Sequence, residues 1–369
     1  MLLLLAACST PSYEPWSTSY VHTVVPWVRD STGHWLLVDT GTPRTQLRPS
    51  TVGGPPGERV VPGWSAGEVS GLDVIVSEAL PDPVLEAEAR GEIVGLGGIL
   101  GADALFRQRF WMDPRSERLW FGDAPTGIEP VAALDVEPTG EGDTCLWDGP
   151  CFAFEDSRIL VDVEVNDVPL TLLLDTAATY LMVDPLTLDR LGVRSHTYDF
   201  GFTALEIGAG EVRFDGLTTP SVAIATTDDA FTESLVRLEL EVDRPVDGVI
   251  GHTFLRRFVV GVDAPEGRLT LSRYTSGPWD LAPDWVTPGF RTIESVDGCF
   301  VVSSVIADSE AERAGLAAGD CLAAVDGLTP DDIASDALMD HLGALGPGAP
   351  VTVTWDGTDL ALPLVDWAR

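Results

Sequence analysis

The sequence has little positive charge. Its 22 Lys and Arg residues are outnumbered by 58 Asp and Glu residues, which gives a formal net charge of −36 over 369 residues. A field of that sign repels phosphate backbones, so we expect no nucleic-acid partner. Apolar residues make up 45% of the chain, which is enough for packed cores and argues against disorder of the whole chain. A chain of this length usually forms two or three domains.

Histidine and cysteine are also scarce, with five of each. The histidines are scattered and no cysteine pair has the spacing of zinc ligands, so we expect no metal site and no cofactor. Cys145 and Cys151 flank an Asp-Gly turn that would bring the two thiols together. Cys299 and Cys321 would join neighbouring strands of a later domain. Two such disulfides indicate an oxidising compartment.

The first eight residues, "MLLLLAAC", resemble a bacterial lipobox, in which Cys8 is lipidated and becomes the mature N-terminus. The Ser/Thr/Pro-rich stretch that follows is typical of a tether. Residues 1–19 therefore predict a protein of the bacterial cell envelope, in the periplasm or at the cell surface, held at the membrane by this lipid only. The apolar run is short and no basic residue precedes it. The alternatives are a start that lies further upstream, or an ordinary cysteine at position 8.

Two stretches of the chain repeat each other. Residues 99–121 and 249–271 align without a gap at an offset of 150, and the shared residues include Gly101/Gly251 and Asp113/Asp263. Such self-similarity predicts a duplicated half-domain. Both copies consist of short apolar or alternating segments between Gly, Pro and Asp turns, which is typical of β-structure. Helical signals are short, as at residues 83–90 and 185–191.

Each copy also contains an apolar strand that ends in an aspartate. The run "HWLLVDTG" leads to Asp39 and the run "LTLLLDTA" leads to Asp175, at an offset of 136. Since 150 − 136 = 14, the second copy carries about 14 extra residues. A carboxylate at the end of a buried strand costs on the order of several kcal/mol unless it is paired, hydrogen-bonded or neutralised. One Asp-Thr-Gly alone can be a simple turn, but two in matched settings indicate that each aspartate is the other's partner.

The pattern of two apolar residues, Asp-Thr-Gly or Asp-Thr-Ala, and a later apolar-apolar-Gly resembles the retropepsin-like half of an aspartic protease. The resemblance spans about residues 20–275 and implies a mainly β fold. Two acid-protease β-barrel lobes, residues 20–135 and 136–280, would be related by a pseudo-twofold axis. It also implies that the threonines hydrogen-bond across the axis and that the neighbouring small residues support the loops. The matching segments are Asp39-Thr40-Gly41 with Ile99-Leu100-Gly101, and Asp175-Thr176-Ala177 with Val249-Ile250-Gly251.

The resemblance implies an aspartic-type endopeptidase, a hydrolase, with Asp39 and Asp175 as catalytic residues. Two carboxyls that share one proton have one lowered and one raised pKa. The ionised carboxyl would take a proton from water while the protonated one polarises the scissile carbonyl, with no metal or cofactor. The substrate would be an extended polypeptide bound as a strand between the lobes. The alternative is an inactive cell-envelope lipoprotein that binds peptides or proteins.

A flap over the active site belongs to the same resemblance. We expect the flap of the first lobe near "VPGWSAGE", residues 61–68, with Trp64 in contact with substrate. The alternative is that Trp64 is a core residue.

The C-terminal region has a different character. Its stretch "DGCFVVSSVIADSEAERAGLAAGDCLAAVDGLTP" resembles a PDZ domain, an α+β unit that we place at residues 286–366. Its helices would lie at residues 310–314 and 335–346. PDZ domains add a peptide as a strand at a sheet edge and bind its terminal carboxylate. We expect either a C-terminal peptide ligand or a unit that only packs on the lobes. The expected carboxylate-binding loop is Asp297, Gly298, Cys299 and Phe300.

Overall fold

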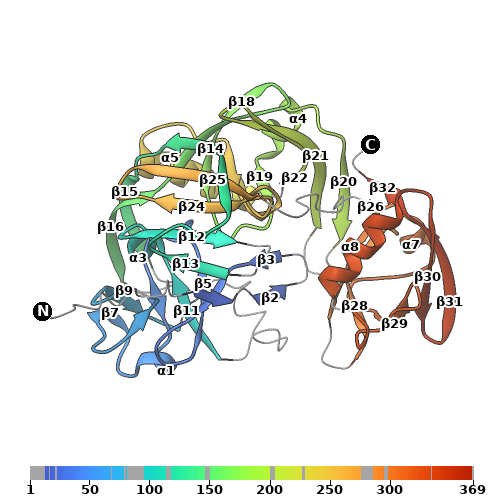
Figure 1. The fold of residues 1–369 in the computed structure, drawn as a ribbon, viewed down its shortest axis with the longest axis horizontal. Helices are drawn as coiled ribbons and strands as arrows, with labels where there is room; N and C mark the ends of the chain where they lie inside the picture. The colour runs from blue at the N-terminus through green and yellow to red at the C-terminus, as the bar shows by residue number, and fades with distance from the viewer. Residues whose placement is uncertain are drawn as a thin grey trace, which may run out of the picture.

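A computed structural model shows a mainly β chain with a few short helices (Figure 1). Cys8 and the expected helix at 83–90 lie outside the described residues. Within the described ranges, no helix is long and apolar enough to cross a membrane. The structure describes residues 13–15, 17–20, 23–67, 69–78, 80, 95–113, 118–145, 150–199, 204–226, 229–275, 286–294, 298–333 and 335–367.

Residues 27–105 form lobe 1, which contains a six-stranded sheet. In sheet order its strands are β4 (Trp27–Arg29), β5 (Trp35–Val38), β11 (Leu96–Leu100), β6 (Gln46–Leu47), β10 (Asp73–Val76) and β7 (Gly57–Val60). β5 and β11 run parallel and are almost entirely buried, which explains why their sequences are continuously apolar rather than alternating. The remaining elements are α1 (Pro49–Val52), the hairpin of β8 (Ser65–Ala66) and β9 (Val69–Ser70), and α3 (Ala102–Leu105).

Residues 160–255 repeat this arrangement as lobe 2. The matching strands, in the same order, are β17 (Leu160–Val165), β18 (Val168–Leu174), β23 (Gly248–Ile250), β19 (Leu181–Val183), β22 (Leu217–Thr226) and β21 (Ala204–Phe214). β18 and β23 are again parallel, and an extra pairing of β17 with β21 closes the sheet into a barrel. The helices are α4 (Pro185–Arg190), α5 (Asp229–Val242) and α6 (His252–Leu255). Asp184 caps α4 by accepting the N–H groups of Leu186 and Thr187.

A third sheet joins the two lobes and contains their symmetry axis. Its order is β1 (Tyr13–Pro15), β13 (Arg118–Phe121), β12 (Arg109–Asp113), β24 (Val259–Asp263), β25 (Arg268–Tyr274) and β14 (Ile128–Asp135). At its centre Trp111 pairs with Gly261, residues that occupy equivalent positions in the two copies. A Cβ on Gly261 would collide with the Trp111 ring, so glycine is required opposite the indole. The duplication is therefore present in the structure as a pseudo-twofold arrangement.

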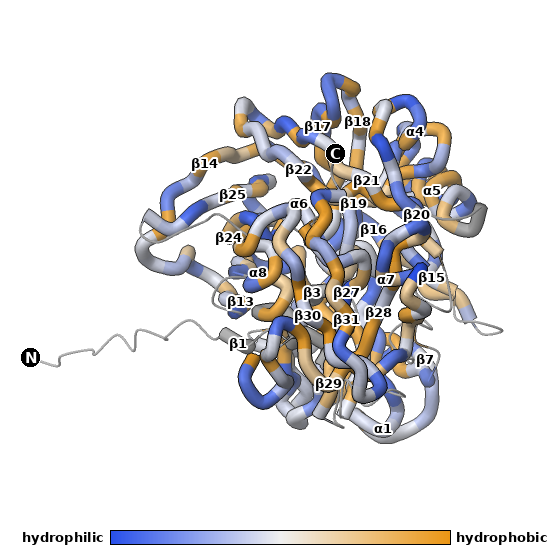
Figure 2. Tube along the Cα trace, turned by 90° about the vertical axis from the view of Figure 1, so that its right-hand side faces the viewer, coloured by the Kyte–Doolittle hydropathy of each residue, from blue (hydrophilic) through white to orange (hydrophobic). Residues whose placement is uncertain are grey.

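Residues 286–366 form a separate unit with its own hydrophobic core, drawn in red in Figure 1. One continuous core runs through lobes 1 and 2, and hydrophobic segments, orange in Figure 2, recur along the strands of both parts. The elements of this C-terminal unit are β26 (Val286–Thr287), β27 (Phe290–Glu294), β28 (Phe300–Ile306), α7 (Glu310–Arg313), β29 (Cys321–Val325), α8 (Ser335–Leu345), β30 (Pro350–Trp355), β31 (Thr358–Pro363) and β32 (Val365–Asp366).

The extra residues of the second copy form an additional strand, β20 (Ser195–Asp199). Gln46 pairs with Ile75 in lobe 1, and the equivalent Met182 pairs with Ala225 in lobe 2. The separations are 75 − 46 = 29 and 225 − 182 = 43, so all 14 extra residues fall between these strands. β20 forms a hairpin with β21, and its outer edge pairs with β28 of the C-terminal unit. One twelve-stranded sheet thus continues from lobe 2 into that unit.

Both expected disulfides are present, Cys145–Cys151 and Cys299–Cys321. The first closes the hairpin of β15 (Thr139–Cys145) and β16 (Cys151–Arg158), in which the two cysteines face each other across the ladder. This hairpin connects the two lobes in sequence and contacts both, through α3 of the first copy and α5 of the second.

Candidate active site

The two aspartates lie on equivalent loops, directly after β5 and β18. The Asp39 N–H donates to the Leu100 carbonyl at 3.0 Å, and the Asp175 N–H donates to the Ile250 carbonyl at 3.2 Å. Leu100 and Ile250 are each followed by a glycine, and steric contacts require glycine at both positions. A Cβ on Gly101 would lie 2.6 Å from the Arg44 backbone carbon, and one on Gly251 would collide with backbone oxygens of the Asp175 loop. The apolar-apolar-Gly motif therefore lets each aspartate loop pass directly over its supporting strand.

Thr40 and Thr176 join the two loops by a symmetric set of hydrogen bonds. The Thr40 N–H donates to Thr176 Oγ1 and the Thr176 N–H donates to Thr40 Oγ1, both at 3.1 Å. Each hydroxyl then donates to a carbonyl of the opposite lobe at 2.8 Å, Thr40 to Leu174 and Thr176 to Val38. Both threonines are fully buried. Four hydrogen bonds between fully buried groups hold the loops in one relative position.

The loops bring Asp39 and Asp175 together. A Cβ on Gly41 would lie 2.5 Å from Asp175 Oδ2, so the first loop lies directly against the second carboxyl, and no side chain fits between them. Ala177 holds the equivalent place in the second loop. Asp39 is 8% exposed and Asp175 is half-buried, so solvent reaches a pair whose surroundings are mostly protein.

The two carboxyls differ in their hydrogen bonds. Asp39 Oδ1 accepts the N–H groups of Gly41 and Thr42 at 2.8 and 3.0 Å, and its Oδ2 accepts the Thr42 hydroxyl at 2.6 Å. Asp175 Oδ1 accepts the N–H groups of Ala177 and Ala178, both at 2.9 Å. Ala178 occupies the position of Thr42 and has no hydroxyl to offer. The ionised form is therefore better stabilised at Asp39.

The pKa values follow this difference. The pKa of Asp39 is raised by burial rather than lowered as expected, although the hydrogen bonds from Thr42 and Gly41 oppose the rise. Burial and then the negative charge of Asp39 raise the pKa of Asp175 to about 7. Because two adjacent carboxyls resist double ionisation, a single proton is retained by the pair and resides mainly on Asp175.

Three further polar side chains support the loops of the pair, two by contacting a loop carbonyl and one by pairing with the first, and sequence reasoning missed all of them. Arg158, at the end of β16, donates from Nη1 to the Gly41 carbonyl and forms an ion pair with Glu241 of α5 at 2.6 Å. His252 Nε2 lies 2.7 Å from the Thr176 carbonyl. Burial lowers the pKa of His252 to about 3, so its ring is neutral and Nε2 carries the donated hydrogen. The position of His252 directly after Gly251 was the one available signal; Arg158 and Glu241 come from segments with no motif.

The expected contact of Trp64 with substrate is corrected by the structure. Trp64 is 3% exposed, packs in the core of lobe 1 and donates from Nε1 to Asp30 Oδ2 at 3.1 Å. It comes just before the β8–β9 hairpin, which forms a bridge with Asp30 through Ala66. The two lobes also differ after their first helix. In lobe 1 four residues connect α1 to β7, whereas in lobe 2 the additional strand β20 follows α4 and forms a hairpin with β21.

The expected carboxylate-binding loop of the C-terminal unit stays a prediction, because the structure describes only part of it. Asp297 lies outside the described residues, and Gly298 is exposed. Cys299 and Phe300 are buried, the first in its disulfide and the second in the core of the unit. The strand that begins at Phe300 is β28, and its edges are occupied by β27, β29 and β20. Among the residues that the structure describes, both edges of β28 are therefore occupied, whereas β27 pairs with β28 along one edge.

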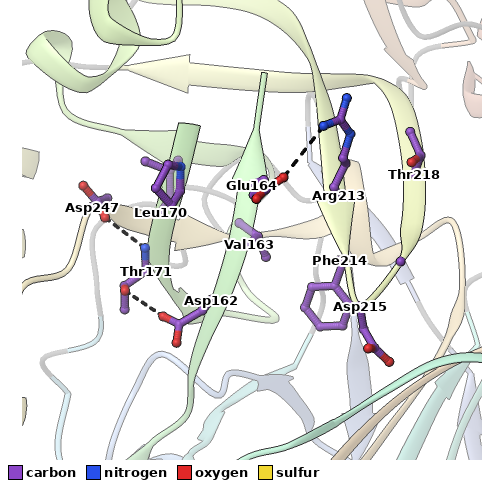
Figure 3. A pocket seen from close by; sticks show the side chains of 12 residues that line it. Asp162, Val163, Glu164, Leu170, Thr171, Arg213, Phe214, Asp215, Thr218 and Asp247 are labelled. Carbon is purple, nitrogen blue, oxygen red and sulfur yellow. Dashed lines mark hydrogen bonds and ion pairs between the residues drawn. The ribbon is translucent and has the colours of Figure 1, made fainter. Parts of the chain in front are cut away.

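A separate hollow of about 570 Å³ lies on lobe 2 and contains neither aspartate of the pair (Figure 3). It is lined by the β17–β18 hairpin, the turn after Arg213 and Asp247. Its carboxylates are engaged: Asp247 accepts the Thr171 N–H, Asp162 accepts the Thr171 hydroxyl, and Glu164 pairs with Arg213 at 3.8 Å. In the part of the chain that the structure describes, no group of three or more His, Cys, Asp or Glu side chains is placed to hold a metal ion.

Comparison with known proteins gives weak likenesses. No protein-family model and no curated protein matches the sequence. Among solved structures, the chain is similar to the aspartic proteinase from Irpex lacteus, with 15% identity, 72% of this chain and 97% of that chain covered, and a TM-score of 0.42. It is also similar to a retropepsin-like aspartic protease from Rickettsia conorii, with 16% identity, 38% and 92% covered, and a TM-score of 0.24.

Proposed function

We propose that the protein is an aspartic endopeptidase built from two retropepsin-like lobes, in which Asp39 and Asp175 hydrolyse peptide bonds. The observation that carries the proposal is the threonine network, because four buried hydrogen bonds between two lobes serve to fix the two carboxyls against each other. An extended polypeptide would be the substrate. A pair used only as a turn or a core contact has no need of this symmetry.

The proposed chemistry uses one water and no covalent intermediate. The ionised Asp39 takes a proton from the water as its oxygen attacks the carbonyl carbon, and Asp175 gives its proton to the carbonyl oxygen. The tetrahedral adduct then breaks its C–N bond as Asp39 returns its proton to the leaving nitrogen and Asp175 recovers its own. The products are a new carboxyl terminus and a new amino terminus.

The pH dependence of this activity follows from the pair. Asp175 has its pKa raised to about 7, so we expect kcat/KM to fall as pH rises through about 7, where the shared proton is lost. It should fall again in acid, where Asp39 gains a proton and can no longer accept one from water. The measurement is kcat/KM for one peptide between pH 3 and pH 9. A flat profile over this range would contradict the shared-proton mechanism.

Digestion of a peptide library tests the proposal. The wild type and Asp39→Asn would be incubated with the library under mildly acidic conditions, and the new termini mapped by mass spectrometry. The proposal predicts cleavage inside peptides by the wild type and none by the variant. An equal set of products from both proteins, or no cleavage by either, would contradict it; the latter result would favour a binding protein.

For the C-terminal unit we propose a PDZ-like role in binding the C-terminal end of a peptide. This rests on the sequence resemblance and on the position of β27, which pairs with β28 on one side and packs against α8. An added strand would lie along β27. We also propose export to a bacterial cell envelope with Cys8 as a lipid anchor, which the lipobox and the two disulfides support.

A further inference from the structure

Arg158 is a charged side chain in an unusual place. It is 7% exposed, and its guanidinium bridges two segments that are far apart in sequence. Nη2 and Nε both donate to Glu241 Oε2, at 2.6 and 3.0 Å, while Nη1 donates to the carbonyl of Gly41. Gly41 belongs to the Asp39 loop and lies directly against Asp175. The guanidinium is thus held at the edge of the carboxyl pair.

The surrounding structure fixes Arg158 in this position. Its guanidinium carbon lies 5.2 Å from the centre of the Phe154 ring, on the same strand. A Cβ on Gly140 of the neighbouring strand would lie 2.9 Å from the Arg158 side chain, so glycine leaves the room that the arginine needs. Glu241 is 13% exposed and follows Leu240 near the end of α5. An ion pair this buried persists only when both partners are held in good geometry.

Other charged and titratable groups around the pair contribute less net charge. Arg44, just after the Asp39 loop, donates to Asp103 of α3 at 3.1 Å and also pairs with Glu58 of β7. Its positive charge is therefore compensated within lobe 1. His252 of α6 faces the Asp175 loop but is neutral. Arg158 is the cation that acts on both carboxyls, and it favours their ionised forms.

We propose that Arg158 is a positioning residue of the aspartate pair: held by Glu241, it fixes the Asp39 loop through the Gly41 carbonyl and supplies the positive charge beside the two carboxyls. This inference rests on the proposed peptidase function for its meaning in catalysis. The arrangement also links the disulfide-closed hairpin of β15 and β16 and the helix α5 to the reacting groups. Because Glu241 cancels part of the arginine charge, the ion pair lowers the pKa values of the two aspartates less than a lone arginine would.

The two halves of this ion pair should affect the carboxyls in opposite directions. Arg158→Gln removes a cation and leaves Glu241 as an unpaired anion, so Asp175 should titrate at higher pH. Glu241→Gln leaves the cation uncompensated, so Asp175 should titrate at lower pH. We expect each shift to be at least about half a pH unit. Arg158→Lys keeps the charge and should stay close to the wild type in titration, but its single ammonium cannot reproduce all three hydrogen bonds.

The experiment is a ¹³C NMR titration of the aspartate carboxyl carbons in the full chain, with the Asp175 signal assigned through its loss in Asp175→Asn. Arg190→Gln is the matched control, because Arg190 forms an ion pair with Asp247 at 2.8 Å in the same lobe and does not contact the pair. Opposite shifts in Arg158→Gln and Glu241→Gln, with none in the control, would support the proposal. Unchanged titration, or shifts of the same sign, would overturn it. The titration needs no turnover, so an inactive wild type would count against the peptidase function alone. If Arg158→Gln does not fold, the sign of the shift in Glu241→Gln decides.

Discussion

Asp39→Asn and Asp175→Asn are each expected to lower kcat/KM by at least about 10³-fold. Either substitution removes the shared proton, since an amide neither accepts a proton from water nor donates one as a carboxyl does. The double variant should be no worse than the single variants, because the two side chains act as a unit. Peptide hydrolysis by the three variants measures this. Turnover close to wild type in either single variant would contradict the assignment.

Stability measurements show whether the aspartate variants lose activity because they unfold, and we expect that they remain folded. The pKa of Asp175 is raised to about 7 in the folded chain, so the unfolded chain ionises this group first as pH rises. The free energy of unfolding therefore falls as pH rises from the ordinary aspartate pKa to about 7. Asp175→Asn should be at least as stable as the wild type at pH 7 to 8. Asp162→Asn, at an exposed carboxylate, is the control for activity and should retain it.

Thr40→Val and Thr176→Val are expected to destabilise the protein by roughly 2–4 kcal/mol each. Each substitution keeps the shape of the side chain but removes a hydroxyl that accepts one N–H and donates to one carbonyl in the opposite lobe. The orphaned groups are fully buried, so water cannot replace the lost partner. Denaturant unfolding measures the change in the free energy of unfolding.

Thr253→Val is a matched control for these variants. Thr253 is also buried, and its hydroxyl accepts the Leu181 N–H at 3.1 Å and donates to the Ala223 carbonyl at 2.9 Å, but within lobe 2 alone. It should lose similar stability while kcat stays near that of the wild type. Thr40→Val and Thr176→Val should lose kcat as well, because the carboxyls are no longer held together. Equal kcat in all three variants would show that the threonine network serves stability only.

Short-range patterns account for what the sequence predicted well. The matched loops were identified from the gapless repeat and from the two apolar strands that end in Asp39 and Asp175. These features are visible in short stretches of sequence, because a buried parallel strand must be continuously apolar and the supporting strand must be followed by glycine. The two disulfides followed from a hairpin turn and from neighbouring strands. The number of extra residues in the second copy was also correct, although their form as β20 was not evident from the sequence.

Long-range placement accounts for what the sequence did not predict. Arg158 and Glu241 are 83 residues apart, and the Gly41 carbonyl that Arg158 contacts lies 117 residues before it. The pairing of β20 with β28 joins segments about a hundred residues apart, and nothing in either strand specifies the other. Trp64 was expected in the flap that the resemblance implies, yet Asp30 accepts its indole N–H in the core. Contacts of this kind depend on tertiary packing rather than on period or turn chemistry.

The central claim, that Asp39 and Asp175 share one proton, is tested most directly by ¹³C NMR titration of the carboxyl carbons in the wild type and in Asp39→Asn. In the wild type one carboxyl of the pair should titrate near pH 7 and the other at a lower pH. In Asp39→Asn the Asp175 signal should titrate at a lower pH than in the wild type, since the neighbouring negative charge is gone. Two carboxyls that titrate independently at the ordinary pH of an aspartate, with Asp175 unmoved by Asp39→Asn, would contradict the claim.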